Sequence, residues 1–213
     1  MKHLLLTLTF AGCLYLLHAQ TERFDVSIEY TPNYSKLTDN FSNPGFNFSH
    51  QFFTRAEWNL SRRFGVSIGL GYVNARDRWT VFLEGQNDID YIELYTNHDY
   101  ITIPVGLKYN FGSWYVRPEI GIGLNFSNPG RLMRQVTFKI NGEKIVSRWD
   151  DFNQRNYNDL SFPIFFSVGR EFKVKTLSVQ LGVKGFYSLE QVVLENYWNQ
   201  HYIGLGVLTG IRF

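Results

Sequence analysis

The sequence is short of cysteine and of charge. Its one cysteine, Cys13, lies in an amino-terminal apolar segment, so we expect the mature chain to have no disulfide and no thiolate for catalysis or metal binding. Charged residues make up 19%, and 21 Lys and Arg nearly balance 19 Asp and Glu, so no nucleic-acid partner is expected. After residue 19 no run approaches 18 uncharged apolar residues, which argues against a membrane-spanning helix.

The first segment has the features of a secretory signal peptide. Lys2 and His3 precede an apolar run of 14 residues that ends at Leu17, too short to cross a bilayer as a helix. We predict cleavage after Ala19, which leaves residues 20–213 as one mature domain.

Cys13 also allows a second interpretation. Phe10-Ala11-Gly12-Cys13 resembles a bacterial lipobox, in which the cysteine would be lipidated. The next residues, Leu14-Tyr15-Leu16-Leu17, continue the apolar run where a lipoprotein usually becomes polar. We therefore favour an ordinary signal peptide over a lipid anchor.

The mature chain is rich in aromatic residues, at 17% of the sequence, and apolar residues alternate with polar ones or glycine. A period of two is typical of β-strands. Eight segments show it, at about residues 24–30, 48–58, 64–72, 101–109, 114–126, 160–169, 177–187 and 202–213. The apolar face of these segments carries almost no charge, whereas the opposite face carries Gly, Ser, Arg, Glu and Lys, which predicts a barrel with lipid outside and a polar interior.

Connection lengths separate this barrel from a β-sandwich, which would show the same alternation. Long connections at residues 31–46, 74–98, 127–159 and 188–200 alternate with short ones at 61–63, 110–113 and 170–176. The sequence therefore predicts an all-β fold, an eight-stranded antiparallel transmembrane up-and-down β-barrel with short periplasmic turns and long extracellular loops.

Aromatic residues fall near both ends of the predicted strands, as interfacial belts do. The turn-end belt contains Trp58, Phe64, Tyr109, Phe111, Trp114 and Phe172, and the loop-end belt contains Tyr30, Phe48, Tyr72, Tyr100, Phe126, Phe162 and Tyr187. Proline removes a backbone donor, so we expect bulges or local tilt at the strand prolines Pro104, Pro118 and Pro163.

Three stretches resemble the outer-membrane-protein β-barrel domain family, which includes PorT-like and OmpX-like small barrels: residues 100–109 (YITIPVGLKY), 118–124 (PEIGIGL) and 210–213 (GIRF). The resemblance spans about residues 22–213 and implies a bacterial outer-membrane location. The carboxy-terminal pattern with Ile211 and Phe213 looks like the signal that the barrel-assembly machinery reads. Outer-membrane lipid and lipopolysaccharide are the other partners that the resemblance implies.

The predicted interior contains four acids and five bases: Asp25, Glu29, Glu57 and Glu119 against Arg55, Lys108, Arg117, Lys184 and Arg212. Because eight strands enclose a space that side chains can fill, we favour an ion-paired interior. A narrow ion path is the alternative.

No catalytic or metal-binding pattern is apparent, and no cofactor is expected. Ser49 and His50 are adjacent and should point to opposite faces, His201 has no nearby serine, and His98, beside Asp99, belongs to a loop end. Acidic residues crowd the second long connection, namely Glu84, Asp88, Asp90, Glu93 and Asp99, but their spacing matches no calcium loop.

The third long connection is predicted to contain a hairpin at about residues 131–150, because Asn141-Gly142 is a tight-turn dipeptide between two alternating stretches. Its candidate partner-binding residues are Arg131, Arg134, Lys139, Asn141, Gly142, Lys144, Arg148 and Trp149. They could contact other outer-membrane or surface proteins, or an anionic polysaccharide.

We therefore expect a non-enzymatic barrel that is a structural or accessory subunit of an outer-membrane secretion, uptake or assembly complex. The alternatives are a surface adhesin or receptor that uses the long loops, and a lipid A-modifying enzyme.

Overall fold

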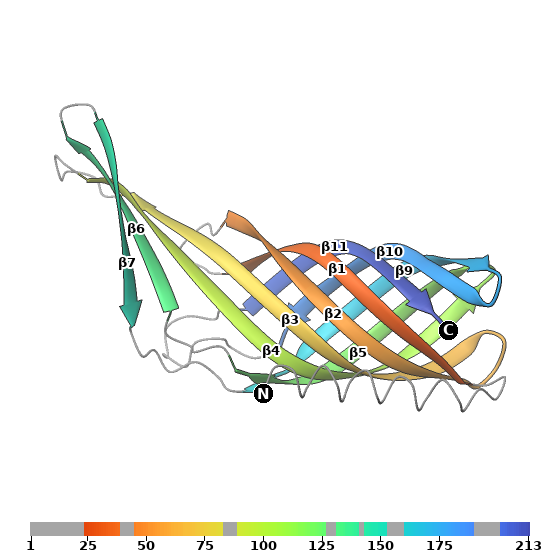
Figure 1. Ribbon diagram of the computed structural model, residues 1–213. Helices are drawn as coiled ribbons and strands as arrows, with labels where there is room; N and C mark the ends of the chain where they lie inside the picture. The colour runs from red at the N-terminus through yellow and green to blue at the C-terminus, as the bar shows by residue number, and fades with distance from the viewer. Residues whose placement is uncertain are drawn as a thin grey trace.

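The computed structural model describes residues 24–38, 45–82, 89–126, 131–140, 143–152, 160–189 and 201–213, so the predicted signal peptide with Cys13 lies outside the described residues. The regular elements of this part of the chain are β-strands (Figure 1). Their bounds are β1 Phe24–Thr38, β2 Gly45–Asn59, β3 Phe64–Phe82, β4 Ile89–Phe111, β5 Trp114–Asn125, β6 Arg131–Ile140, β7 Glu143–Phe152, β8 Leu160–Ser161, β9 Pro163–Val174, β10 Leu177–Ser188 and β11 His201–Arg212. Among the described residues, no helix is long and apolar enough to cross a membrane.

Eight strands close into a ring in the order β1, β2, β3, β4, β5, β9, β10 and β11, each antiparallel to the next, with β11 pairing back to β1. The two-residue strand β8 continues β9 along the same neighbour, β5. The remaining strands, β6 and β7, lie outside the ring. The prediction of a closed eight-stranded antiparallel barrel is confirmed.

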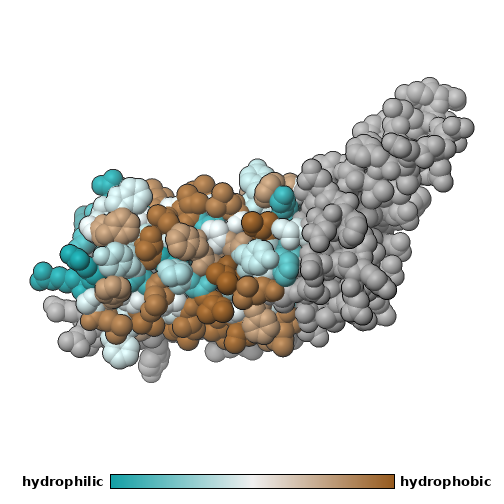
Figure 2. All heavy atoms as spheres, turned by 180° about the vertical axis from the view of Figure 1, so that it is seen from behind, coloured by the Kyte–Doolittle hydropathy of each residue, from teal (hydrophilic) through white to brown (hydrophobic). Residues whose placement is uncertain are grey.

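Alternating side chains explain why these segments form a barrel wall. Along β5, Tyr115, Arg117 and Glu119 are buried inside, whereas Ile120 and Ile122 are 55% and 59% exposed on the outside. The same arrangement holds around the ring, where exposed apolar side chains cover the outer wall (Figure 2). Apolar groups on the outside and charged groups inside are the pattern of a barrel whose solvent is lipid.

Two of the short connections are tighter than the sequence predicts. Gly112 and Ser113 join β4 to β5, and Lys175 and Thr176 join β9 to β10. The first residue of each pair has a positive φ, +69° at Gly112 and +58° at Lys175, which fits the type II′ turns of two-residue hairpins. Residues 60–63 join β2 to β3, and the Ser61 hydroxyl accepts hydrogen bonds from the backbone N–H groups of Arg63 and Phe64.

The predicted bounds of the long connections differ from the structure. Much of the predicted second loop, residues 74–98, is strand, because β3 continues to Phe82 and β4 begins at Ile89. Residues 31–38 extend β1. In the third predicted loop, β6 and β7 pair as a hairpin where the sequence predicted one, at about residues 131–150. β4 has 23 residues, more than twice the roughly 9–11 that a strand needs to cross a bilayer.

The strand prolines do not cause the bulges that we expected. Opposite Pro104, the β3–β4 pairing stops between Gly71↔Thr102 and Ile68↔Val105, but the register is the same on both sides of the gap. The pairing around Pro118 and Pro163 likewise keeps its register. Each strand therefore accommodates its proline by leaving out one hydrogen bond, without a bulge. The register shifts that the structure describes lie elsewhere, between Phe46 and His50 and between Ile89 and Tyr91.

Candidate functional site

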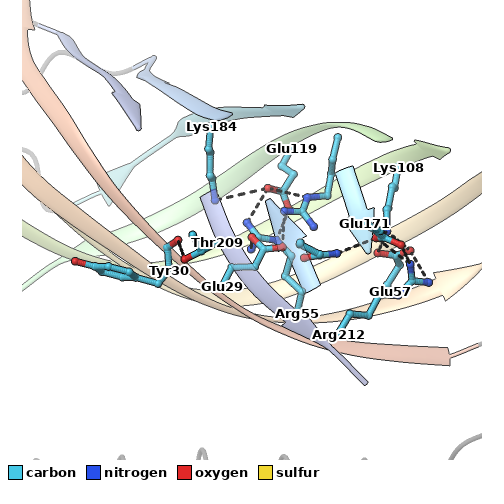
Figure 3. Close-up of polar contacts among 12 residues, drawn as sticks. Glu29, Tyr30, Arg55, Glu57, Lys108, Glu119, Glu171, Lys184, Thr209 and Arg212 are labelled. Carbon is cyan, nitrogen blue, oxygen red and sulfur yellow. Dashed lines mark hydrogen bonds and ion pairs between the residues drawn. The ribbon is translucent and has the colours of Figure 1, made fainter. Parts of the chain in front are cut away.

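The middle of the barrel holds a group of buried charges that we call the central cluster: Glu29, Arg55, Arg117, Glu119 and Lys184 (Figure 3). Arg55 donates to both carboxylate oxygens of Glu119, from Nε at 2.7 Å and from Nη2 at 2.8 Å, and it also pairs with Glu29. Arg117 donates from Nη2 to Glu29 Oε1 at 2.6 Å. Each glutamate is thus held by at least one arginine from another strand, as buried charges require.

A second group, the end cluster, lies nearer the short turns and consists of Asp25, Glu57, Lys108, Glu171 and Arg212. Lys108 Nζ donates to both oxygens of Glu57 at 3.1 Å and to Glu171 Oε1 at 2.6 Å. Arg212 Nη1 donates to Glu171 Oε2 at 2.8 Å, and its Nη2 pairs with Asp25. Carboxylates and bases from five strands thereby meet at one end of the interior. Figure 3 shows Glu57, Lys108, Glu171 and Arg212 gathered there.

Glu171 is the member of these clusters that the sequence reasoning missed. The predicted sixth segment ended at Gly169, and Glu171 was assigned to a turn, whereas β9 continues to Val174. The alternation that places Phe165, Ser167 and Gly169 inside would have placed Glu171 there too. With Glu171 included, the two clusters contain five acids and five bases.

Above the central cluster, buried apolar side chains form a cluster, with buried polar residues such as Gln51, Ser49 and Asn33 also in the interior. The apolar cluster, which we call the aromatic plug, consists of Phe53, Val73, Ala75, Tyr100, Phe165, Phe186 and Tyr202. Along β2, the inward residues Glu57, Arg55 and Phe53 follow one another at two-residue steps, so the end cluster, central cluster and aromatic plug succeed each other away from the short turns. Tyr100, predicted for the loop-end belt, is only 3% exposed and belongs to this plug, because its parity on β4 directs it inward.

Lys184 joins the charged and the aromatic layers. Its Nζ lies 3.3 Å from the Phe53 ring centroid and 4.7 Å from that of Phe165, which are cation–π contacts. The same Nζ has no hydrogen-bond partner, and its separation from Glu119 Oε2 is 4.0 Å. Lys184 is therefore held mainly by rings, unlike the other cations of the clusters.

Glycines make room for the inward rings. Three inward aromatic residues lie directly opposite a glycine on the next strand, in the pairs Phe53–Gly71, Tyr115–Gly169 and Phe186–Gly204. A Cβ added at Gly71 would lie 2.2 Å from Phe53, and one at Gly204 would lie 2.1 Å from Phe186. The interior glycines thus make room for the rings, whereas the sequence suggested only a polar interior.

The filled layers leave no passage for water at their level. Arg55, Lys108, Arg117, Phe53 and Phe165 are at most 1% exposed, although they come from different sides of the ring. An eight-stranded barrel is narrow enough for side chains to fill it in this way. Near the short turns, a polar cavity of about 700 Å³ opens below the end cluster, with Asn59, Arg62 and Ser113 among its lining residues.

The histidines lie apart from one another. His50 is on the outer wall beside Phe52 and Tyr72, whereas the neighbouring Ser49 is buried inside, as their adjacency predicted. His98 is buried with its ring 5.1 Å from that of Tyr202, and His201 Nδ1 is 3.0 Å from the Ser188 carbonyl oxygen. None of these contacts, within the described part of the chain, arranges a nucleophile, a base and an acid together.

The acidic residues of the second connection form no metal site among the residues that can be described. Asp99 accepts hydrogen bonds from the Tyr72 hydroxyl at 2.7 Å and from Asn74 Nδ2 at 2.6 Å. Glu84 and Asp88 lie outside the described residues. For Asp90 and Glu93 only the backbone is described, as part of β4.

The candidate partner-binding residues lie on the two strands outside the ring. β6 and β7 pair from Arg131↔Phe152 to Ile140↔Glu143, and the predicted turn Asn141-Gly142 lies outside the described residues. Arg131, Arg134 and Lys139 are on β6, and Lys144, Arg148 and Trp149 are on β7, where only the backbone is described. β6 also pairs with the outer part of β4, between Ile89 and Tyr95.

These pairings build a four-stranded sheet beyond the barrel, which we call the arm: residues 79–82 of β3, residues 89–95 of β4, and all of β6 and β7 (Figure 1). The proposed assembly residues lie at the opposite end. Ile211 is 44% exposed on the outer wall, and the Phe213 N–H donates to the Val26 carbonyl at 2.9 Å, which joins the carboxy terminus to β1.

Comparisons with known proteins show the family of the chain. The family model described as "Outer membrane protein beta-barrel domain" matches residues 18–193. Among solved structures, the chain is similar to the attachment invasion locus protein Ail of Yersinia pestis, with 11% identity, 90% of this chain and 99% of that chain covered, and a TM-score of 0.45. It is also similar to the outer membrane protease OmpT of Escherichia coli (7% identity, 90% and 96% covered, TM-score 0.42) and to OprG of Pseudomonas aeruginosa (8%, 90% and 96%, 0.39). No curated protein matches the chain.

Proposed function

We propose that this chain, which belongs to the outer membrane protein beta-barrel domain family and lies in the bacterial outer membrane, has a non-enzymatic role. It would be a structural or accessory subunit that binds another protein outside the membrane. The arm is the observation that carries this proposal. It places four paired strands beyond the barrel, on the side opposite to the short turns. In outer-membrane barrels the short turns face the periplasm, so the arm would face the cell exterior.

The way in which the arm joins the barrel supports a binding role. β3 and β4 run without a break from the barrel wall into the arm, and β4 exchanges its partner β5 for β6 between Tyr100 and Tyr95. Backbone hydrogen bonds therefore link the arm to the wall on two strands. A binding surface that is built on such strands is held more precisely than one on a free loop.

The last strand of the arm offers a specific kind of contact. Within the described part of the chain, β7 pairs with β6 alone, so the other edge of its ten residues carries backbone N–H and C=O groups available to a further strand. Proteins commonly bind an extended segment of a partner along such an edge. A partner with an extended segment is therefore the class that fits the arm best.

The interior supports a structural role for the barrel itself. The central cluster and the aromatic plug fill its cross-section, so the barrel has the character of an anchor rather than a pore. Buried ion pairs add little net stability but disfavour other arrangements of the strands, which suits a rigid anchor.

Extraction from native membranes in mild detergent, followed by sizing, tests the proposal. The full chain is expected in a particle larger than the monomer, whereas a variant with residues 131–152 replaced by a short Gly-Ser linker should run as the monomer. Its barrel should still show the heat-dependent gel mobility of a closed barrel. A matched control with Arg62→Gln and Arg63→Gln, at the opposite end, should keep the large particle. A strictly monomeric wild-type protein would contradict the proposal.

A receptor for anionic polysaccharide is the second candidate, because β6 and β7 carry five basic residues, Arg131, Arg134, Lys139, Lys144 and Arg148, against three acidic ones, Glu143, Asp150 and Asp151. Such binding would weaken with salt and with replacement of these residues by Gln, while the size of the native particle would not change. Binding to the immobilised polysaccharide that is independent of all five replacements would exclude this candidate.

A further inference from the structure

The short-turn end of the barrel carries an excess of exposed positive charge. The short turns and the strand ends beside them, residues 59–64, 110–114 and 170–178, are all described, and their exposed charged side chains are all cations. We call these residues the basic rim: Arg62, Arg63, Arg170, Lys173 and Lys175. The nearest acids are already engaged, because Glu171 is bound by Lys108 and Arg212 and Asp25 is paired with Arg212. Hydrophilic residues gather at this end in Figure 2, next to the apolar wall.

Arg170 places the basic rim at the edge of the lipid-facing wall. Its guanidinium carbon lies 5.1 Å from the Phe172 ring centroid and 5.9 Å from that of Trp114, and its Nε donates to Ser113 Oγ at 3.1 Å. Trp114 and Phe172 are 45% and 40% exposed on the outside of the barrel. Exposed aromatic rings at the end of a membrane barrel mark the level of the lipid headgroups. Arg170 is therefore fixed at headgroup height.

Lys175 is in a backbone conformation that a lysine disfavours. Its φ of +58° is the one positive value at a non-glycine residue among those described, and the equivalent position of the neighbouring turn is Gly112, with φ +69°. Glycine adopts this conformation without steric penalty, whereas a side chain opposes it. A cation at such a position suggests a use for the charge, because the turn would form more easily with glycine.

We infer that the basic rim binds the anionic headgroups of phospholipids in the periplasmic leaflet of the membrane. The chemistry is that of a phosphate monoanion held by guanidinium and ammonium groups. A lipid fits better than an acidic protein, because Arg170 lies against the exposed rings of the wall, where the acyl chains of the same molecule would lie. The rim residues also lie at two places separated around the ring: Arg62 and Arg63 are in the β2–β3 connection, and Arg170, Lys173 and Lys175 are at the end of β9 and in the turn after it. Arg62 and Lys173 also line the polar cavity near the short turns, so Arg63, Arg170 and Lys175 are the rim residues that do not line this cavity.

Fluorescence quenching by lipids with brominated acyl chains tests the inference on the full-length mature chain, because Trp58 and Trp114 are exposed at this end of the wall. The protein is placed in phosphatidylcholine vesicles that contain a minor fraction of brominated phosphatidylglycerol or brominated phosphatidylcholine. We expect an association constant several-fold higher for phosphatidylglycerol. The rim variant Arg62→Gln, Arg63→Gln, Lys173→Gln, Lys175→Gln keeps Arg170 and its ring contacts, and it should lose most of this preference.

The control Lys36→Gln, Arg76→Gln removes cations at the opposite end of β1 and β3 and should keep the preference. Half-molar salt should reduce the preference of the wild type, since exposed charges are screened, and this measurement does not depend on the folding of any variant. Equal quenching by both lipids in the wild type overturns the inference. A lipid preference that survives in the rim variant or in half-molar salt also overturns the inference. The same holds for a preference that is lost only in the control variant. A wild type without lipid preference that captures an acidic periplasmic protein through the rim would overturn it in favour of a protein partner.

Discussion

In the central cluster, removal of one charge is expected to lower the stability of the barrel at one residue and to maintain or raise it at another. The cluster's two acids and three bases give a formal charge of +1. Glu119→Gln raises this charge to +2 and leaves Arg55 without the carboxylate that accepts its hydrogen bonds at 2.7 and 2.8 Å. Removing one partner of a buried ion pair costs about 3–5 kcal/mol of unfolding free energy.

Lys184→Met brings the cluster to zero charge instead. The ammonium gains about 2 kcal/mol from the rings of Phe53 and Phe165, but its removal from water costs several kcal/mol, which no hydrogen bond offsets. A methionine can keep the contacts with both rings. We therefore expect Lys184→Met to leave stability unchanged or to raise it by up to about 2 kcal/mol, so that it differs from Glu119→Gln by at least about 3 kcal/mol.

Lys108→Met is the matched control, because Lys108 is as buried as Lys184 but donates three hydrogen bonds to Glu57 and Glu171. The Lys108→Met variant should lose about 3–5 kcal/mol of unfolding free energy. The assay is urea unfolding of the barrel in phospholipid vesicles, followed by tryptophan fluorescence and by the mobility of unheated samples in gels. If Lys184→Met is as destabilising as Lys108→Met, the reasoning about the central cluster is refuted.

Three further predictions follow from the packing and the turns. Gly71→Ala should lower the free energy of unfolding by about 1–3 kcal/mol, because its Cβ would lie 2.2 Å from Phe53. Gly185→Ala, whose Cβ would have no atom outside the adjacent residues nearer than 3.6 Å, should lower it by less than about 1 kcal/mol. Equal losses of the two variants in urea unfolding would contradict the packing argument. Lys175→Gly removes the positive-φ penalty and should leave stability unchanged or raise it by about 1 kcal/mol, and a clear loss in the same assay would show that the lysine side chain stabilises the turn. The purified protein should show no single-channel steps in planar bilayers, because Phe53 and Arg55 are fully enclosed, and regular conductance steps would disprove a filled interior.

The membrane-spanning parts of the strands could be predicted because lipid and interior impose different chemistry on alternate residues. β5 shows this clearly, with exposed Ile122 and Leu124 next to buried Gly121 and Gly123. The signal fades where the strands leave the membrane. Val73, Asn74 and Ala75 are each at most 1% exposed, so both faces of β3 are covered there and no period of two remains. For this reason the sequence placed a loop where β3 continues.

The interior was predicted in composition but not in arrangement. The inward positions of Glu29 and Arg117 follow from alternation, yet nothing in the pattern shows that their side chains meet. The inward rings, such as Phe53 and Phe165, were visible on the same face, but the excess of aromatic residues was attributed to the interfacial belts. Their separation into a layer above the charges depends on how far each strand is displaced along its neighbour.

The sequence by itself determined that the chain forms a barrel in the outer membrane, because alternation, connection lengths and the location of charge are local properties of each segment. Only the tertiary structure decided which charges pair and where the arm forms. Arg212 meets Asp25 across 187 residues, and Arg55 meets Glu119 across 64, once the ring has closed. Such contacts depend on the register of all eight strands together, whereas a period of two gives only the face on which each residue lies.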